Sequence, residues 1–229
     1  MMPSDVNLEK AKRAAVRWVA VTLLGASLPA SAQPAPVIDN ERVTVWDIVL
    51  EKGTAGPVTP HDMDTVIMIL EGGRIRTVTG GGKASTATRK FGDALFVPKG
   101  TDARQTLLSD ASAHEIVVAL KDYRVPAIVN TTGLPAAYPR PGSVKALDTD
   151  RITVWQYSWT RGVPTPMHFH DKDVVVAYRY DGTLKSVTPD GASVDNPHKA
   201  GEIRFNKANR SHYEELTTDR QSALIMELK

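Results

Sequence analysis

Hydrophobic residues in positions 33–229 occur in short runs that are separated by turn-forming residues. Some runs alternate with polar residues, as in Val43-Thr44-Val45-Trp46, and others are nearly continuous, as in residues 174–180. Sequences such as Pro189-Asp190-Gly191 between the runs are typical of tight turns. Apart from one or two possible turns in residues 122–145, no segment has a sustained helical period. The pattern therefore predicts an all-β chain of many short strands, arranged as a sandwich or a barrel.

The second half of the chain repeats the first half in a single register. Residues 42–46 (Arg-Val-Thr-Val-Trp) match residues 151–155 (Arg-Ile-Thr-Val-Trp). The same offset aligns further glycine, proline, histidine, aspartate and phenylalanine positions, namely Gly53/Gly162, Pro57/Pro166, His61/His170, Asp62/Asp171, Asp64/Asp173, Gly73/Gly182, Gly82/Gly191, Gly92/Gly201 and Phe96/Phe205. So many matches in one register indicate an internal duplication, so the chain contains two copies of one β-rich unit.

The duplication divides the chain into segments. We expect an N-terminal unit in residues 33–121, in which residues 33–41 form an arm, and a C-terminal unit in residues 146–229. Residues 122–145 between them are rich in proline and glycine, a composition that opposes both helix interiors and central strands. This segment is therefore predicted to be an ordered loop that links the two units.

The first 32 residues have the pattern of a secretory signal peptide. Basic residues precede and enter an apolar run, residues 18–24, and Ala30-Ser31-Ala32 supplies the small residues that a signal peptidase recognises. The run is much shorter than the roughly 18 apolar residues of a membrane span. We expect cleavage after Ala32 and a periplasmic or secreted protein that is not embedded in a membrane. An amphipathic N-terminal helix of the mature domain is the alternative.

Charge and cysteine content narrow the possible functions. The net charge of the chain is +2, and residues 1–32 carry four basic and two acidic side chains, so the remainder is close to neutral. Such a chain lacks the basic excess that binding to nucleic acid requires. The chain has no cysteine, which excludes disulfide bonds and a thiol nucleophile.

The second copy contains two spaced motifs. Gly162 is followed after five residues by His168-Phe169-His170, and Gly182 comes later; Gly201 is followed by His212 after ten residues. These paired spacings resemble the two motifs of the cupin superfamily. The resemblance implies a bicupin, in which two jelly-roll β-barrels lie in one chain and pack as two cupin subunits do.

The two copies depart from the cupin pattern in different ways. The metal-binding glutamate of the family corresponds to Val66 in the first copy and, by our alignment, to Val175 in the second. The first copy has the residues Thr59, His61 and Ala103 where the second has three histidines. The resemblance therefore implies a degenerate N-terminal barrel, with any metal site in the C-terminal barrel.

His168 and His170 lie two residues apart, so in a strand they point to the same side, and His212 would approach from a neighbouring strand. Imidazole nitrogens bind Zn, Fe, Cu and Ni, and three of them leave coordination positions open. We expect the site to bind a divalent transition metal. Fe(II) is the metal we expect, and Zn, Ni and Mn are the alternatives. Three neutral ligands leave the full +2 charge on the ion, which favours a substrate that chelates as an anion.

Two functions from different classes follow from this site. The first is an exported metal-dependent enzyme of dioxygenase or lyase type, acting on a small anionic organic molecule. Its ligand set is similar to that of the acetylacetone-cleaving and thiol dioxygenases among the cupins, which is an analogy. The second is a non-catalytic bicupin that binds a small ligand or a partner subunit and whose histidines are relics. The chain could act as a monomeric bicupin or as a homodimer.

Several other residues are candidates for roles near the site. Glu214 lies two residues beyond His212 and is predicted to point inward as a proton carrier, or else to be a solvated carboxylate. Arg179 shares the phase of Val175 and is predicted to bind a substrate carboxylate inside the barrel, or to cap its end. Asp173 could replace the missing glutamate, but its counterpart Asp64 lies in the copy without the three histidines, which favours a structural role.

The remaining polar and aromatic positions suggest structural roles. His114 and His198 are expected at the surface, because no ligand spacing surrounds them. Trp46 and Trp155 match between the copies and are expected to be core residues. Gly80-Gly81-Gly82 is predicted to be the tip of a hairpin.

Overall fold

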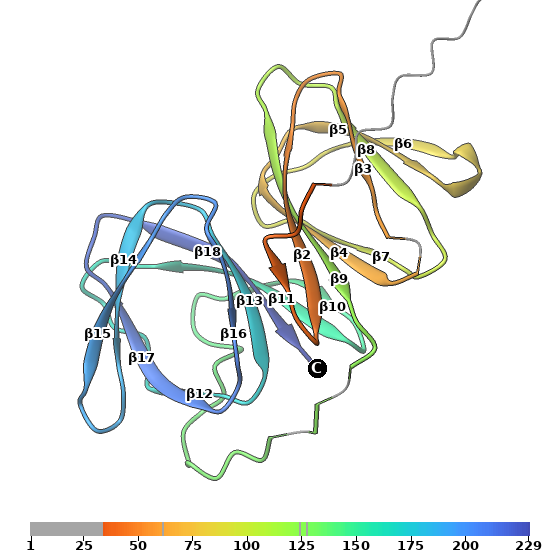
Figure 1. Ribbon diagram of the computed structural model, residues 1–229. Helices are drawn as coiled ribbons and strands as arrows, with labels where there is room; N and C mark the ends of the chain where they lie inside the picture. The colour runs from red at the N-terminus through yellow and green to blue at the C-terminus, as the bar shows by residue number, and fades with distance from the viewer. Residues whose placement is uncertain (1–33, 61, 124, 127) are drawn as a thin grey trace, which may run out of the picture.

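The computed structural model describes residues 34–60, 62–123, 125–126 and 128–229, and its regular structure is almost entirely β-strand (Figure 1). The first copy contains β1 (Ile38–Asp39), β2 (Val43–Leu50), β3 (Ala55–Val58), β4 (Asp64–Glu71), β5 (Arg74–Thr79), β6 (Ala84–Thr88), β7 (Ala94–Val97), β8 (Ala103–Leu107) and β9 (Ala113–Leu120). The second contains β10 (Val144–Asp148), β11 (Ile152–Trp159), β12 (His168–His170), β13 (Asp173–Tyr178), β14 (Gly182–Val187), β15 (Ser193–His198), β16 (Ile203–Asn206), β17 (Arg210–Leu216) and β18 (Gln221–Leu228). The all-β prediction is confirmed. The predicted leader, residues 1–32, lies outside the described residues.

The strand order shows the duplication in three dimensions. Each copy has a five-stranded sheet, ordered β1-β2-β9-β4-β7 in the first and β10-β11-β18-β13-β16 in the second. Each also has a four-stranded sheet, ordered β3-β8-β5-β6 and β12-β17-β14-β15. Adding nine to each strand number in the first copy therefore gives the strand order of the second copy. The short η1 turn (Gly80–Gly82) connects the antiparallel partners β5 and β6, which confirms the predicted hairpin tip.

Three hydrophobic cores hold the chain together. Each barrel has its own interior core, and Trp46 and Trp155 belong to these cores as predicted. A third core lies between the two five-stranded sheets and contains residues from both copies, such as Val66 from β4 and Val175 from β13. The outer faces of these sheets are apolar, so joining them removes both from water and makes the two barrels one body (Figure 1).

Two equivalent ion pairs flank the shared core. Nη1 of Arg42 donates to Oδ2 of Asp173 at 3.0 Å, and Nη1 of Arg151 donates to Oδ2 of Asp64 at 2.8 Å. The other oxygen of each aspartate accepts a backbone N–H of its own copy, from Ala208 and Lys99 respectively. The exchange of arginines between equivalent positions is what a two-fold relation between the barrels produces. Asp173 therefore links the two barrels, which is the structural role expected from its match to Asp64.

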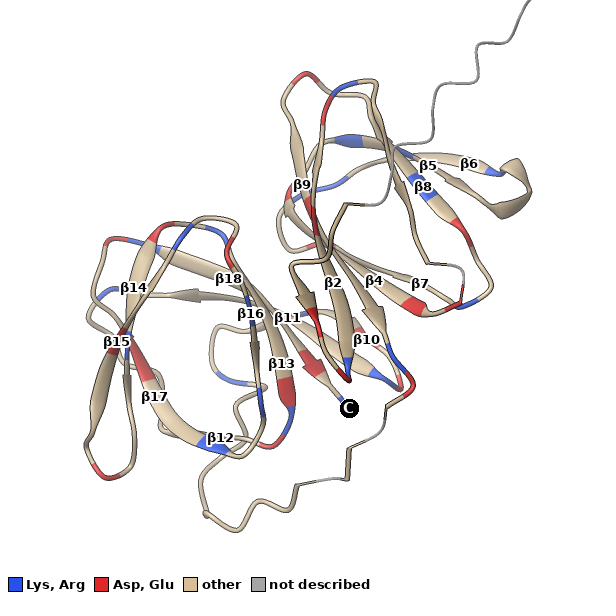
Figure 2. Cartoon of the chain, viewed as in Figure 1, with Lys and Arg blue, Asp and Glu red and all other residues tan. Residues whose placement is uncertain are grey.

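Charged residues of both signs are interspersed along both barrels (Figure 2). This distribution agrees with the near-zero net charge of the chain after residue 32. Among the described residues, no helix is long and apolar enough to span a membrane.

Candidate metal centre

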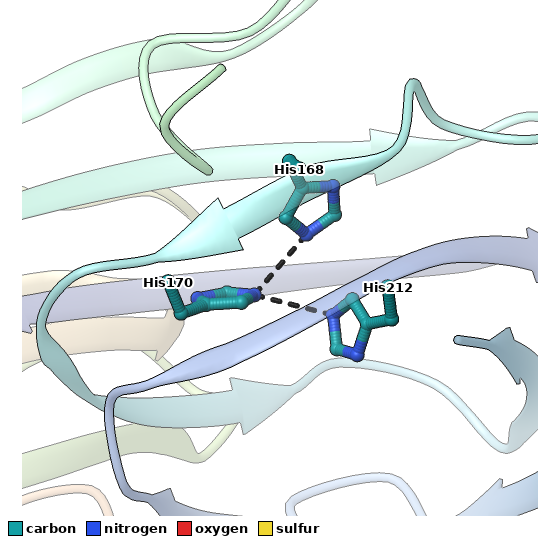
Figure 3. A group of neighbouring side chains, drawn as sticks. All are labelled: His168, His170 and His212. Carbon is teal, nitrogen blue, oxygen red and sulfur yellow. Dashed lines mark hydrogen bonds between the residues drawn. The ribbon is translucent and has the colours of Figure 1, made fainter. Parts of the chain in front are cut away.

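The three predicted histidines meet inside the C-terminal barrel (Figure 3). His168 and His170 lie on β12, and antiparallel pairing of β12 with β17 places His212 directly opposite His168. Nε2 of His170 lies 3.1 Å from Nε2 of His168 and 3.2 Å from Nε2 of His212. In the part of the chain that the structure describes, this is the one cluster of its kind, and its ligand atoms all lie within 4.8 Å of one another.

Contacts on the far side of two rings orient the cluster. Nδ1 of His168 lies 2.8 Å from the carbonyl oxygen of Pro166, and Nδ1 of His212 lies 3.1 Å from Oγ of Ser186. A carbonyl only accepts, so Nδ1 of His168 carries the proton, and in the neutral ring Nε2 then presents its lone pair to the centre. Such outer contacts are typical of histidines that bind metals. Nδ1 of His170 is buried and has no partner among the described residues.

The electrostatic environment keeps the three rings neutral. Burial lowers the pKa of His168 to about 4, and it also lowers the pKa of His170 and of His212. The positive charge of Arg140 acts in the same direction on all three rings. Neutral imidazole is the form that binds a metal, so no proton has to be removed from these rings near neutral pH. Three converging neutral donors fit a divalent transition metal, which His168, His170 and His212 would hold.

Val174, and not Val175, faces the cavity beside the three histidines, so our assignment of Val175 was wrong. Val174 and Val176 line the cavity beside the histidines, whereas Val175 lies in the core between the barrels. Consecutive residues of a strand point to opposite sides, so a shift of one residue exchanges the two faces. The expectation that an apolar residue replaces the carboxylate still holds.

Glu214 lies beside the cluster, and it points inward as predicted. Its Oε1 lies 3.8 Å from Nε2 of His212, and its Oε2 accepts hydrogen bonds from Nε1 of Trp159 at 3.1 Å and Nη2 of Arg140 at 3.3 Å. Burial opposes its ionisation, but the positive charge of the Arg140 guanidinium and the hydrogen bond from the Trp159 N–H favour the carboxylate, and the pKa of Glu214 is lowered. The alternative of a solvated carboxylate at a strand end is therefore wrong.

The linker contributes two side chains that sequence reasoning missed. The backbone of Phe169, between the two histidines of β12, donates to the carbonyl of Pro135 and accepts from the N–H of Ala137, both at 2.9 Å. The linker thus runs beside the ligand strand and places Tyr138 and Arg140 inside the barrel, both buried. The sequence Tyr138-Pro139-Arg140-Pro141 could have indicated a fixed position for Arg140, because prolines restrain the backbone on both sides of the arginine.

Arg179 is not in the barrel, and its predicted substrate role is not supported. Its Nε lies 3.4 Å from Oε1 of Glu71 in the first copy, and its guanidinium lies 4.3 Å from the ring centre of Phe91. Arg179 points to the same side of the chain as Val175, as predicted, but that side faces the other barrel. Arg179 therefore belongs to the contact between the copies.

The surface prediction is wrong for His198. Its side chain is buried, and its ring centre lies 3.7 Å from that of Tyr178, which lines the cavity. Burial lowers the pKa of His198 to about 4. His114 is partly buried, and its Nε2 contacts Oδ1 of Asp47.

The first copy has a different arrangement at the equivalent positions. The backbone N–H of Thr59 donates to the carbonyl of Ala103, and Oγ1 of Thr59 accepts from the N–H of Ala103, both at 3.0 Å. These residues match His168 and His212, so this pair supplies no ring nitrogen. His61, which matches His170, lies outside the described residues.

A small cavity of about 30 Å³ adjoins the cluster. His170, His212, Glu214, Arg140 and Arg210 all line it. The histidines are neutral, so these side chains carry two positive charges and one negative charge. A bound divalent ion would increase the positive excess, which favours a small anion as ligand.

Comparison with known proteins identifies the fold. No protein-family profile and no curated protein sequence matches the chain. Among solved structures, a cupin 2 conserved barrel domain protein from Leptotrichia buccalis is 16% identical, with a TM-score of 0.52, over 85% of this chain and 87% of that chain. Oxalate decarboxylase from Bacillus subtilis, described as having Mn(II) centres, is 13% identical, with a TM-score of 0.57, over 82% and 69%. AerE from Microcystis aeruginosa is 10% identical, with a TM-score of 0.60, over 85% and 96%.

The chain therefore has the cupin fold, in two tandem jelly-roll barrels, as the sequence motifs predicted. Identities this low establish the fold and not the reaction.

Proposed function

We propose that the protein is an exported metalloenzyme whose C-terminal barrel holds a divalent transition metal, Fe(II) first, and acts on a small anionic organic substrate. The observation that carries this proposal is the convergence of three Nε2 atoms, two of whose rings are oriented by outer contacts. Mn(II) is the main alternative, because the oxalate decarboxylase neighbour is described as having Mn(II) centres. Export rests on the signal-peptide pattern of residues 1–32.

The residues around the cluster have separate tasks in this proposal. An ion held by the three histidines would supply Lewis-acid or redox activation of the substrate. Glu214 accepts hydrogen bonds from Arg140 and Trp159, so its carboxylate is ionised and can take a proton from a substrate held beside His212. Val174 and Val176 provide an apolar wall. This arrangement suits a reaction of dioxygenase or lyase type.

The first test is elemental analysis of residues 33–229, produced without a histidine tag and reconstituted anaerobically with Fe(II) or Zn(II). We expect close to one metal ion per chain, and loss of this metal in His170→Ala. His198→Ala is the matched control, because His198 is a buried histidine of the same barrel outside the cluster. It should keep its metal. An unmodified protein that binds neither of these metals, and does not bind Mn(II) under the same conditions, would refute the proposal.

A further inference from the structure

The guanidinium of Arg140 has buried donors that the protein does not use. Its side chain is 6% exposed, yet Nε and Nη1 have no hydrogen-bond partner among the described residues. Nη2 alone is engaged, with the hydroxyl of Tyr138 at 2.7 Å and with Glu214 at 3.3 Å. A buried donor without a partner costs free energy, so a fold that keeps such donors beside a cavity suggests an acceptor that arrives with a ligand.

The position of Arg140 is set by the barrel. The guanidinium carbon lies 4.0 Å from the ring centre of Tyr157 and 4.6 Å from that of Tyr138. The Tyr138 ring is itself stacked on Trp155, with ring centres 5.6 Å apart. These contacts limit the movement of the side chain, so a ligand would meet a charge whose orientation is already established.

A second arginine increases the positive charge of the cavity. Arg210 lies on β17 opposite His170, and its Nε donates to the carbonyl of Lys207 at 2.6 Å. Arg210 and Arg140 line the same cavity, and Glu214 is the acidic residue that lines it with them. The cavity therefore attracts anions, and its small size selects against large ones.

From this geometry we propose that linker residue Arg140 is the specificity-determining residue of the site, and that the substrate is a small carboxylate. The substrate carboxylate accepts charge-assisted hydrogen bonds from the unused donors of Arg140, and a neighbouring oxygen of the substrate faces the three histidines. The inference rests on the proposed function, since it places one end of the substrate at the metal.

A purely structural role for Arg140 makes different predictions. If the guanidinium only fills the space between the rings of Tyr138 and Tyr157, its replacement changes stability and leaves ligand affinity unchanged. The test therefore needs a measurement of affinity. It also needs an anion that binds metals without a carboxylate group.

The experiment uses residues 33–229 loaded with Co(II), whose visible spectrum reports on ligands that enter the coordination sphere. Glycolate serves as the carboxylate probe and azide as the other anion. For Arg140→Lys, which keeps the charge and changes the donor geometry, we expect at least a tenfold increase in the Kd of glycolate and less than a threefold change for azide. Arg179→Lys is the matched control and should change neither value.

The other outcomes separate the two proposals. An unchanged Kd for glycolate in Arg140→Lys, or an equal loss for glycolate and azide, overturns the inference about Arg140. If Arg140→Lys does not fold, Tyr138→Phe removes the hydroxyl that positions the guanidinium, and the Kd of glycolate should rise about threefold; no rise overturns the inference. If the unmodified protein binds no Co(II), the proposed function fails and the inference fails with it.

Discussion

Glu115 in the first barrel gives a pH-dependent prediction of stability. This residue of β9 is 2% exposed and lines a small, largely apolar cavity with Ile48 and Val117. Burial raises the pKa of Glu115 to about 7, although the charge of Arg89 opposes the rise. The substitution Glu115→Gln keeps the shape of the side chain and removes its charge.

The magnitude follows from the difference in proton binding between the folded and unfolded chains. In the unfolded chain the carboxyl titrates near its ordinary pKa of 4.5, and in the folded chain at about 7. At pH values between these two pKa values the folded chain binds more protons than the unfolded chain. The free energy of unfolding therefore falls as pH rises and levels off above pH 7. At about 1.4 kcal/mol per pKa unit, the full loss is roughly 3 kcal/mol. The Gln105 amide, with its nitrogen turned to the carboxylate, donates to it and reduces the loss. We therefore expect about 2 kcal/mol.

Thermal unfolding at pH 5 and pH 8 tests this reasoning. Glu115→Gln should be more stable than the unmodified protein at pH 8, by roughly 4–8 °C in Tm for a chain of this size, and nearly equal to it at pH 5. Glu51→Gln replaces an exposed glutamate of the same barrel and should show no such difference. If Glu115→Gln changes Tm by the same amount at both pH values, the carboxyl does not titrate as argued.

Three further predictions concern the contact between the barrels and the metal centre. Arg42→Ala leaves the largely buried Asp173 without its ion-pair partner and should lower the free energy of unfolding by about 3 kcal/mol, whereas the double replacement with Asp173→Ala should cost less than the sum of the single ones in urea titrations. Ser186→Ala removes the outer contact of His212 and should weaken metal binding by about 10-fold in chelator competition, with unchanged affinity counting against an orienting role. Met226→Ala opens a cavity in the core between the barrels and should lower the free energy of unfolding by about 2–5 kcal/mol in urea titrations. A decrease of less than about 1 kcal/mol would mean that this core is loosely packed.

The sequence by itself determined the features that depend on local pattern. Alternation and turn residues predicted the all-β class, and one register of matches predicted two equivalent units, which the strand orders confirm. The histidine cluster was also predictable, because it too follows from local sequence pattern. His168 and His170 share a face through strand geometry, and the spacing from Gly201 to His212 identified the third member.

Only the tertiary structure decided which side of β13 faces the metal centre. Every residue from Val174 to Tyr178 is buried, because one face lines the C-terminal barrel and the other packs on the first copy. In such a strand the hydrophobic pattern is continuous and does not distinguish the two faces. The assignments of Val175 and Arg179 were wrong for this reason.

The contribution of the linker was also decided by the tertiary structure. Residues 122–145 have no period from which a direction could be inferred, and Arg140 enters the barrel because backbone hydrogen bonds attach Pro135 and Ala137 to β12. His198 is buried through its contact with Tyr178 from another strand. These placements depend on contacts between segments far apart in the sequence or without a repeating pattern. Local patterns therefore identified the metal ligands, and packing of the whole chain determined which residues surround them.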